Sequence, residues 1–306
     1  MLRYLSRRLI GTLPLLLVIS MLVFLFIHII PGDPVRHMVD KEATGQEIEA
    51  MRDRLGLNDP LPIQYLHYLS DLFHGNLGTS YKTGLPVWDM LRQRIGATVS
   101  ITVWAILWSV LTGTLIGVLS AVTRGRIPDY LGMVTAISGI SAPGFWVGLV
   151  LINVFAVKLR WVPTGGLSSW RSYILPSITL GIGIMGVLAR FSRSSMMESL
   201  QEDYVRTARA KGQREFMVVL RHAFRNSLMQ VITVVGLQIG GLLAGSVLVE
   251  TVFTIPGLGR LMVDSINFRD YTVIQSLLMF FSLEYIVINL LVDLLYGVLN
   301  PKVRVR

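Results

Sequence analysis

Long apolar stretches dominate the chain and constrain its fold more than any other feature. A helix needs roughly 20 predominantly apolar residues to cross a bilayer, where its backbone hydrogen bonds must all be satisfied internally. Six stretches meet or nearly meet this length: Leu9–Ile30, Ala97–Val122, Leu131–Ala156, Tyr173–Leu188, Leu228–Phe253 and Val273–Leu299. At 52% hydrophobic and 15% charged residues, the 306-residue chain cannot hide this surface in an aqueous core. We therefore expect an all-α integral membrane protein with six transmembrane helices.

Basic residues set the expected orientation, because cytoplasmic loops of membrane proteins carry an excess of Lys and Arg. An inside N-terminus places the eight Lys/Arg of the 189–227 loop in the cytoplasm. The 31–96 segment, with seven Lys/Arg against nine Asp/Glu, then lies outside. Three basic residues fit this arrangement poorly, namely Lys158, Arg160 and Arg171. Both termini are expected in the cytoplasm, and residues 1–306 are expected to form a single transmembrane domain.

The long outer segment carries helix signals of its own. Thr44 and Glu47 have the spacing of a capping box, and Gly56 is suited to end the helix that follows. Pro62 suits the first turn of a second helix, which Gly75 can end. The segment is expected to be helical, either as a cap lying on the membrane or as a docking surface for an external binding protein.

A charged segment, "EDYVRTARAKG" at residues 202–212, interrupts the apolar pattern. Glu202 stands four residues before Arg206, which supports a short helix, and Gly212 permits the left-handed turn that would end it. A second amphipathic stretch, "QREFMVVLRHAFRN", follows and leads into the fifth apolar stretch, which predicts a helix–glycine–helix. An apolar stripe at helical spacing consists of Leu200, Tyr204, Val205 and Ala208. Such a helix is suited either to fit the groove of a partner protein or to lie on anionic lipid through its arginines.

Small residues and a carboxylate inside the apolar stretches are further candidates. Gly113 and Gly117 in the second stretch have spacing that lets helix backbones approach closely. The fifth stretch carries four such glycines, Gly236, Gly240, Gly241 and Gly245. Glu284 lies near the middle of the sixth stretch, where burial of a charge is costly, and it either packs against a neighbour or lines a translocation pathway. Asp293 lies nearer the inner end, where a polar packing role is expected.

The motifs together resemble a known family. "EDYVRTARAKG" followed by "HAFRNSL" is similar to the EAA loop of permease subunits in bacterial ABC importers of the di/oligopeptide, nickel and glutathione group. In the same order as in that family, the chain also carries "PGDP", "GNLGTSY", "ILPSITLG", "VFTIPGLGRLMVDSINFRDYTVIQ" and "NLLVDLLYGVLNPKVR". "FSLEYIVINLLVDLLY" looks closest to the glutathione-transporting members.

The resemblance implies a type I ABC importer permease fold in the bacterial inner membrane. Its expected partners are a second homologous permease, two ATP-binding subunits and a periplasmic solute-binding protein. The chain contains no Gly-Lys dipeptide and so no P-loop, and ATP and Mg are expected in the ATPase subunits. No catalytic, cofactor or metal residue is expected in this chain.

By the same resemblance, the 189–227 loop couples the permease to the ATPases. The coupling residues expected are Glu202, Tyr204, Arg206, Ala208, Arg209 and Gly212. The glycines of the fifth stretch are expected to pack against the partner permease. The implied function is import of small peptides, either di/oligopeptides or glutathione. Nickel or nickel-chelate import is an alternative, as are a proton-coupled secondary transporter using Glu284 and a membrane anchor without transport.

Overall fold

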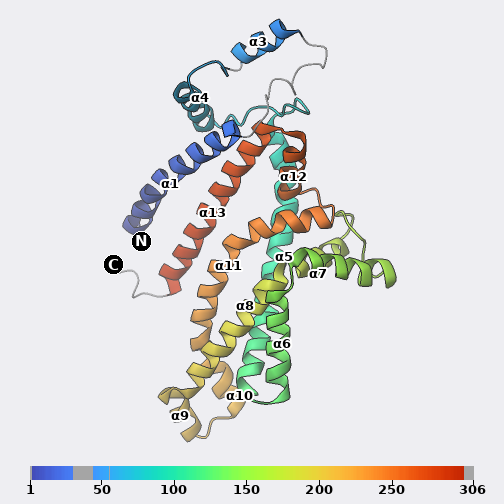
Figure 1. Cartoon of the computed structure of the whole chain (residues 1–306). Coiled ribbons are helices and arrows are strands. Elements are labelled where there is room, and N and C mark those ends of the chain that lie inside the picture. Colours follow the sequence, from blue (N-terminus) through green and yellow to red (C-terminus); the bar gives the residue numbers. More distant parts are fainter. Residues whose placement is uncertain (1, 30–43, 55, 300–306) are drawn as a thin grey trace. The chain divides into compact units, whose positions relative to one another are not determined.

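The computed structural model describes residues 2–29, 44–54 and 56–299, and these are mostly helical (Figure 1). The elements are α1 (Leu2–Ile29), α3 (Gly45–Arg54), α4 (Leu61–Phe73), α5 (Val87–Val122), α6 (Ile127–Ser141), α7 (Gly144–Leu151), η1 (Ile152–Lys158), η2 (Trp170–Tyr173), α8 (Ile174–Gln201), α9 (Asp203–Ala210), α10 (Glu215–Met217), η3 (Val218–Phe224), α11 (Arg225–Val252), α12 (Leu258–Phe268) and α13 (Tyr271–Leu299). Of these, η1 and η3 are π-helical and η2 is a 3₁₀ turn. The all-helical prediction is confirmed for these described ranges, where β pairing is limited to one isolated bridge.

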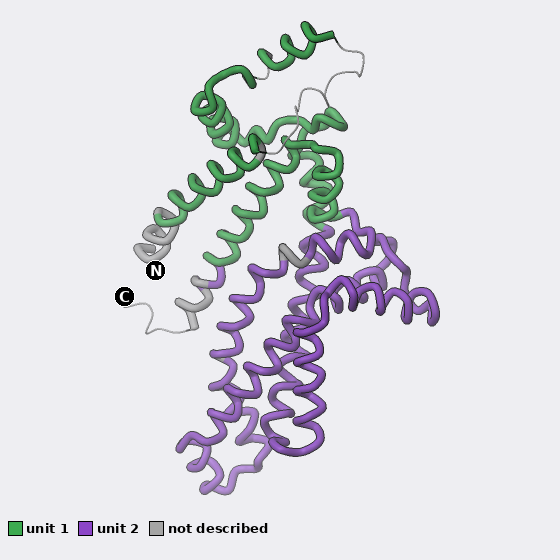
Figure 2. Tube along the Cα trace, viewed as in Figure 1, with its two compact units in different colours: residues 1–96, 257–290 green, residues 97–256, 291–306 purple. Residues whose placement is uncertain are grey.

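The chain divides into two compact units, drawn in different colours in Figure 2. The first unit consists of residues 1–96 and 257–290, and the second of residues 97–256 and 291–306. Each unit has its own buried apolar clusters, and the second contains the whole 189–227 loop.

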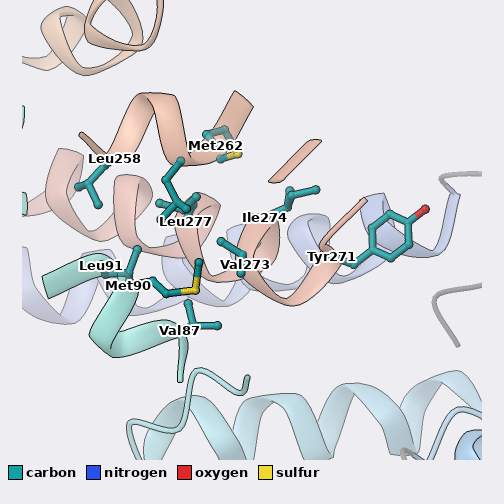
Figure 3. Close-up of a cluster of buried hydrophobic side chains, with 10 residues drawn as sticks. Val87, Met90, Leu91, Leu258, Met262, Tyr271, Val273, Ile274 and Leu277 are labelled. Atoms are coloured by element: carbon teal, nitrogen blue, oxygen red, sulfur yellow. The ribbon is translucent and has the colours of Figure 1, made fainter. Parts of the chain in front are cut away.

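The first unit is built around a cluster where the start of α5 meets α12 and α13 (Figure 3). Leu91 and Leu277 are completely buried there, and Leu258 is almost so. A buried carboxylate, Asp270, accepts hydrogen bonds from the Ser80 hydroxyl (2.5 Å) and the Tyr81 amide (3.2 Å). Satisfying the carboxylate in this way ties two motifs about 190 residues apart into one structure.

The outer helices form where the sequence predicts them. The capping box is present, since the Thr44 amide donates to Glu47 Oε2 (2.8 Å) and the Glu47 amide donates to Thr44 Oγ1 (3.4 Å). Gly56 and Gly75 both have positive φ, at 65° and 71°, and follow α3 and α4. The second outer helix also contacts α1, because the Tyr65 hydroxyl of α4 shares a 2.8 Å hydrogen bond with the Ser20 hydroxyl of α1. The predicted helical outer segment is thus confirmed for Gly45–Arg54 and Leu61–Phe73.

The third apolar stretch is not the single helix that its length suggests. It forms α6 and then α7 with η1, and the two parts are bent by 108°. Pro143 lies at the break and forces the preceding Ala142 out of the helical region, to φ −77° and ψ 130°. The expectation of a continuous Leu131–Ala156 helix is therefore corrected, because a proline with its restricted predecessor overrides apolar periodicity.

Close helix packing in the second unit relies on glycine. A Cβ at Gly113 would lie 2.7 Å from the Met185 carbonyl oxygen, and one at Gly117 would lie 2.5 Å from the Ala189 carbonyl oxygen. Real Cβ atoms do not approach so closely, so α5 and α8 can touch only because both positions are glycine. The predicted packing role of these two glycines is confirmed.

Helix length and composition support between three and five membrane spans among the described residues. Three helices qualify alone, in the ranges 87–122, 170–201 and 271–292, and two bent pairs add one span each if counted as such. The second bent pair lies within α11, between 230–242 and 246–252. A shorter apolar helix covers Gly11–Phe26 of α1.

Candidate coupling site

The charged segment forms a short helix with a defined end. Glu202 is extended, α9 begins at Asp203, and the helix ends before Gly212, whose φ is 72°. The Gly212 amide donates to the Arg209 carbonyl oxygen (2.9 Å), and the Gln213 amide donates to that of Ala208 (3.3 Å). This bond pattern is a Schellman motif with glycine at the left-handed position. The predicted helix–glycine–helix arrangement is confirmed, with α10 and η3 as the second helix.

One face of α9 is buried within the chain itself. Val205 is completely buried and Ala208 is 5% exposed. Their neighbours are apolar residues at the end of α5, in α8 and in η3, namely Ala121, Met196, Val218, Val219 and Ala223. Ala208 was expected to contact an ATPase, and this must be corrected: its methyl group packs in a cluster of this chain's own side chains. Periodicity identifies an apolar stripe but does not say what covers it.

The opposite face of α9 is exposed and charged. The Arg206 side chain is 73% exposed and lies 3.5 Å from the Asp203 carboxylate, a contact too exposed to fix either side chain. Tyr204 is 39% exposed, and its hydroxyl accepts a hydrogen bond from Nδ2 of the Asn226 side chain (3.0 Å). Glu202 is also exposed. Three of the predicted coupling residues, Glu202, Tyr204 and Arg206, are therefore accessible to another protein.

An ion pair closes the turn after α9. Arg209 donates to both carboxylate oxygens of Glu215, from Nη2 at 2.6 Å and from Nε at 3.1 Å. This hydrogen bonding lowers the pKa of Glu215 and raises the pKa of Arg209. Because both side chains are more than two-fifths exposed, solvent screens the pair and it contributes little stability. The pair places the Arg209 guanidinium across the turn. The sequence alone did not predict Glu215 as its partner.

A buried ion pair lies between the spans that lead to this site. Arg193 of α8 binds both carboxylate oxygens of Asp129 in α6, at 2.7 and 2.8 Å. The Asp129 side chain is 4% exposed and also accepts a hydrogen bond from the Gly125 amide (3.0 Å). The sequence alone did not predict this pair, although an aspartate just inside an apolar helix is a signal of one. The pair fixes the half of α8 that continues into α9.

A second buried carboxylate lies in α11 and was not predicted from the sequence. Glu250 of α11 is completely buried, and the Thr98 hydroxyl of α5 donates to its Oε1 at 2.7 Å. The reasoning that singled out Glu284, that a charge inside an apolar stretch needs a role, applies equally here. Glu284 itself is half-buried in α13. The side chain of Asp293 lies outside the described residues.

The glycines of the fifth stretch do not share one environment. A Cβ at Gly236 would collide with the Val292 side chain, so this glycine serves packing of α11 on α13 within the chain. Gly241 is exposed and a Cβ there would meet nothing within 4 Å, while Gly240 is half-buried. The surroundings of Gly245 lie outside the described residues. Gly241 thus remains the position open to a partner helix.

Comparisons with known proteins agree with this architecture. A solved inward-facing structure of the MetNI methionine ABC transporter has a TM-score of 0.58 at 18% identity, covering 69% of this chain and 96% of that one. An amino acid ABC transporter solved with histidines gives a TM-score of 0.56 at 14% identity, covering 68% and 94%. At these identities the likeness shows the fold alone, which is that of ABC importer permeases.

Sequence comparisons are more specific. The chain is 50% identical over 306 residues, the whole of both chains, to the glutathione transport system permease protein GsiC of Pectobacterium atrosepticum and of Escherichia coli K12. The Salmonella typhimurium protein of the same name is 49% identical over the same span. The family model for the N-terminal part of binding-protein-dependent transport system membrane components matches residues 1–102. A second model, for the inner membrane component itself, matches residues 113–305. The chain therefore belongs to the family of binding-protein-dependent transport system inner membrane components.

Proposed function

We propose that this chain is one permease subunit of an ATP-driven importer for small peptides, with glutathione as the main cargo. The observation that carries the proposal is the 50% identity over full length to proteins named as glutathione transport permeases. Nickel import remains the alternative within the wider group. Membership of a binding-protein-dependent family gives no support to the proton-coupled transporter.

The proposed arrangement has six spans and cytoplasmic termini. It counts α1 and both bent pairs as one span each, beside the three helices that qualify alone. Two ATP-binding subunits, which would hold ATP and Mg, a second permease and a periplasmic solute-binding protein complete the importer. The distribution of Lys and Arg supports the cytoplasmic location of α9.

The exposed face of α9 is the proposed contact with an ATPase subunit. Glu202, Tyr204 and Arg206 would meet the partner, while Val205 and Ala208 hold the helix to the permease. Arg209 and Gly212 would act indirectly, by fixing the turn. Because the buried face joins α5, α8 and η3, a movement of α9 is transmitted to spans rather than absorbed by a loose loop.

Cargo is tested by uptake into proteoliposomes that contain the complete importer and its binding protein. Labelled glutathione should accumulate only when ATP is present on the side of the membrane that carries the ATP-binding subunits. Unlabelled glutathione should reduce this uptake more strongly than a dipeptide or Ni²⁺ does. Accumulation driven by a proton gradient without ATP would overturn the proposal. Preferential competition by Ni²⁺ would favour the alternative cargo.

The coupling contact is tested separately by reversing one exposed charge. The proposed contact sets Arg206 against acidic side chains of the ATPase, so Arg206→Glu would bring like charges together. The variant should reduce retention of the ATPase subunits on the purified permease, most strongly at low salt. Arg126→Glu is a matched control, since Arg126 is also exposed but lies in the loop between α5 and α6. Equal retention for both variants would exclude the charged face of α9 as the contact.

A further inference from the structure

An apolar pocket lies in the second unit, at the end of α8 remote from α9. Its volume is about 340 Å³, within the usual range of small-molecule sites. The wall is formed by the end of α7 with η1, the loop after it and the start of α8. The lining residues are Leu151, Phe155, Trp161, Val162, Trp170, Arg171, Ile174, Leu175 and Ile178.

Hydrogen bonds and ring contacts within the chain hold the walls of the pocket in place. The Trp161 amide donates to the Phe155 carbonyl oxygen (2.9 Å), and the two rings lie 5.6 Å apart. On the opposite wall, Ser169 caps the short η2 helix in a reciprocal capping box. Behind the pocket, Leu175 is 4% exposed and belongs to the largest buried cluster of the second unit. The walls are therefore part of the packed fold and not a loose loop.

The chemistry of the lining excludes a peptide as occupant. Eight of the nine lining residues are hydrophobic, and Arg171 supplies the one charged side chain. A peptide bound here would leave its amide groups without hydrogen-bond partners, at a cost that apolar contact does not offset. The pocket suits a flexible hydrocarbon chain.

Position and exposure point to the membrane boundary. The pocket lies between η1, which ends one apolar stretch, and α8, which begins the next. Trp161 and Trp170 are 61% and 72% exposed, and exposed tryptophans are typical of the level of lipid headgroups. Since α8 has 28 residues, its two ends are about 40 Å apart, and the pocket opens at the membrane face opposite the coupling site.

Basic residues surround the pocket without acidic counterparts. The Arg171 guanidinium lies 5.7 Å from the Trp170 ring, and Lys158 and Arg160 flank the other wall, next to Trp161. Residues 157–173 contain no Asp or Glu, and within the described part of the chain none of the three cations forms an ion pair. These are the residues that fit the expected orientation poorly, so their positive charge needs a reason beyond topology.

We propose that this pocket binds an anionic glycerophospholipid of the membrane leaflet remote from α9. One acyl chain fills the apolar pocket, and the phosphate lies against Arg171, with Lys158 and Arg160 adding to the local positive field. The exposed tryptophans flank the glycerol region. A zwitterionic lipid fills the pocket equally well but gains less from the cations, so the site selects by headgroup charge.

The test uses the complete importer in phosphatidylcholine nanodiscs that contain brominated phosphatidylglycerol or brominated phosphatidylcholine. Bromine on an acyl chain quenches only tryptophans that it contacts. The contribution of Trp161 is the difference between wild type and Trp161→Phe. Brominated phosphatidylglycerol should quench this contribution at a mole fraction about five-fold lower than brominated phosphatidylcholine, and Arg171→Gln should abolish most of that difference.

Arg126→Gln is the matched control, because it removes an exposed arginine from the opposite face and should leave the preference unchanged. Native mass spectrometry of the wild-type complex gives a second readout, a retained phosphatidylglycerol that Arg171→Gln loses. Equal quenching by the two lipids would overturn headgroup recognition. Quenching by neither lipid would mean that a partner subunit covers the pocket, and this too would overturn the proposal.

Discussion

Gly212 offers the sharpest test of the proposed coupling site. It has a φ of 72°, and a Cβ built on it would meet nothing within 4 Å. The Cβ of a replacing side chain therefore clashes with nothing, and we take the cost of Gly212→Val to be mainly that of a left-handed backbone. That cost is about 1–2 kcal/mol for a residue with a Cβ. It corresponds to a factor of about 5–30 in an equilibrium between the ordered turn and a distorted one.

The structure indicates where this cost appears. The eight-residue α9 is too short to be stable alone, and the Schellman bonds at Gly212 and Gln213 hold its end. Gly212→Val should loosen this end while Val205 keeps the start of α9 packed. We expect normal membrane insertion and pairing with the second permease, but ATPase binding that is weaker by about 5–30-fold. Gly212→Asn should retain most of the coupling, because Asn tolerates the left-handed region.

Gly75 provides a matched control. Its φ is 71°, it also has open space around it, and the Gly75 and Asn76 amides end α4 with the same pair of hydrogen bonds, to Leu72 and Asp71. Gly75→Val thus imposes the same backbone strain in the other unit of the chain. The assay measures ATPase retention, ATP turnover stimulated by the loaded binding protein, and glutathione uptake in the same proteoliposomes. Wild-type values for Gly212→Val, or equal losses in both Val variants, would refute the reasoning.

Three further outcomes follow from the contacts described. Asp129→Asn should destabilise the chain by about 3–5 kcal/mol, because it leaves Arg193 partly buried without its counter-charge; unfolding in urea within bicelles measures this, and an unchanged midpoint would contradict it. Gly241→Leu should weaken pairing with the second permease in co-purification without lowering the stability of this chain. Gly236→Leu should instead lower the stability of this chain. Identical behaviour of the two variants would exclude separate roles for the two glycines. The ion pair of Glu215 lowers the pKa of that carboxyl, so its small stabilisation is present above the ordinary glutamate pKa and is lost as the pH falls through the lowered one. At neutral pH, Glu215→Gln should therefore melt slightly below wild type, with a loss of stability of less than ~1 kcal/mol. At acidic pH the two proteins should melt at the same temperature.

The sequence predicted the helical class, the outer helices and the helix–glycine–helix of the coupling site. These depend on local signals, such as the Thr44–Glu47 capping box and the glycine after Lys211, that act within a few residues. Apolar length predicted the membrane class equally well, because it depends on composition rather than on packing.

What the sequence did not predict depends on contacts between distant segments. The bend at Pro143 was detectable locally but lost to the apolar pattern around it. The partners of Asp129 and Glu250 lie 64 and 152 residues away, and no periodicity identifies them. Gly236 and Gly241 have the same residue type in the same helix, and only the fold separates an inward position from an open one.

The burial of Val205 and Ala208 limits how partner choice can be exchanged between related permeases. A graft of residues 202–212 alone would transfer the outward-facing charges but would set two foreign side chains against Met196, Val218 and their neighbours. A misfit of even one methylene in such a cluster is felt, so the grafted helix would sit at a new angle. The smallest exchangeable module is therefore α9 together with the neighbouring segments that it packs against, from the last turns of α8 through η3. At the proposed coupling site, specificity for an ATPase would be inherited as a small folded element, not as a short peptide motif.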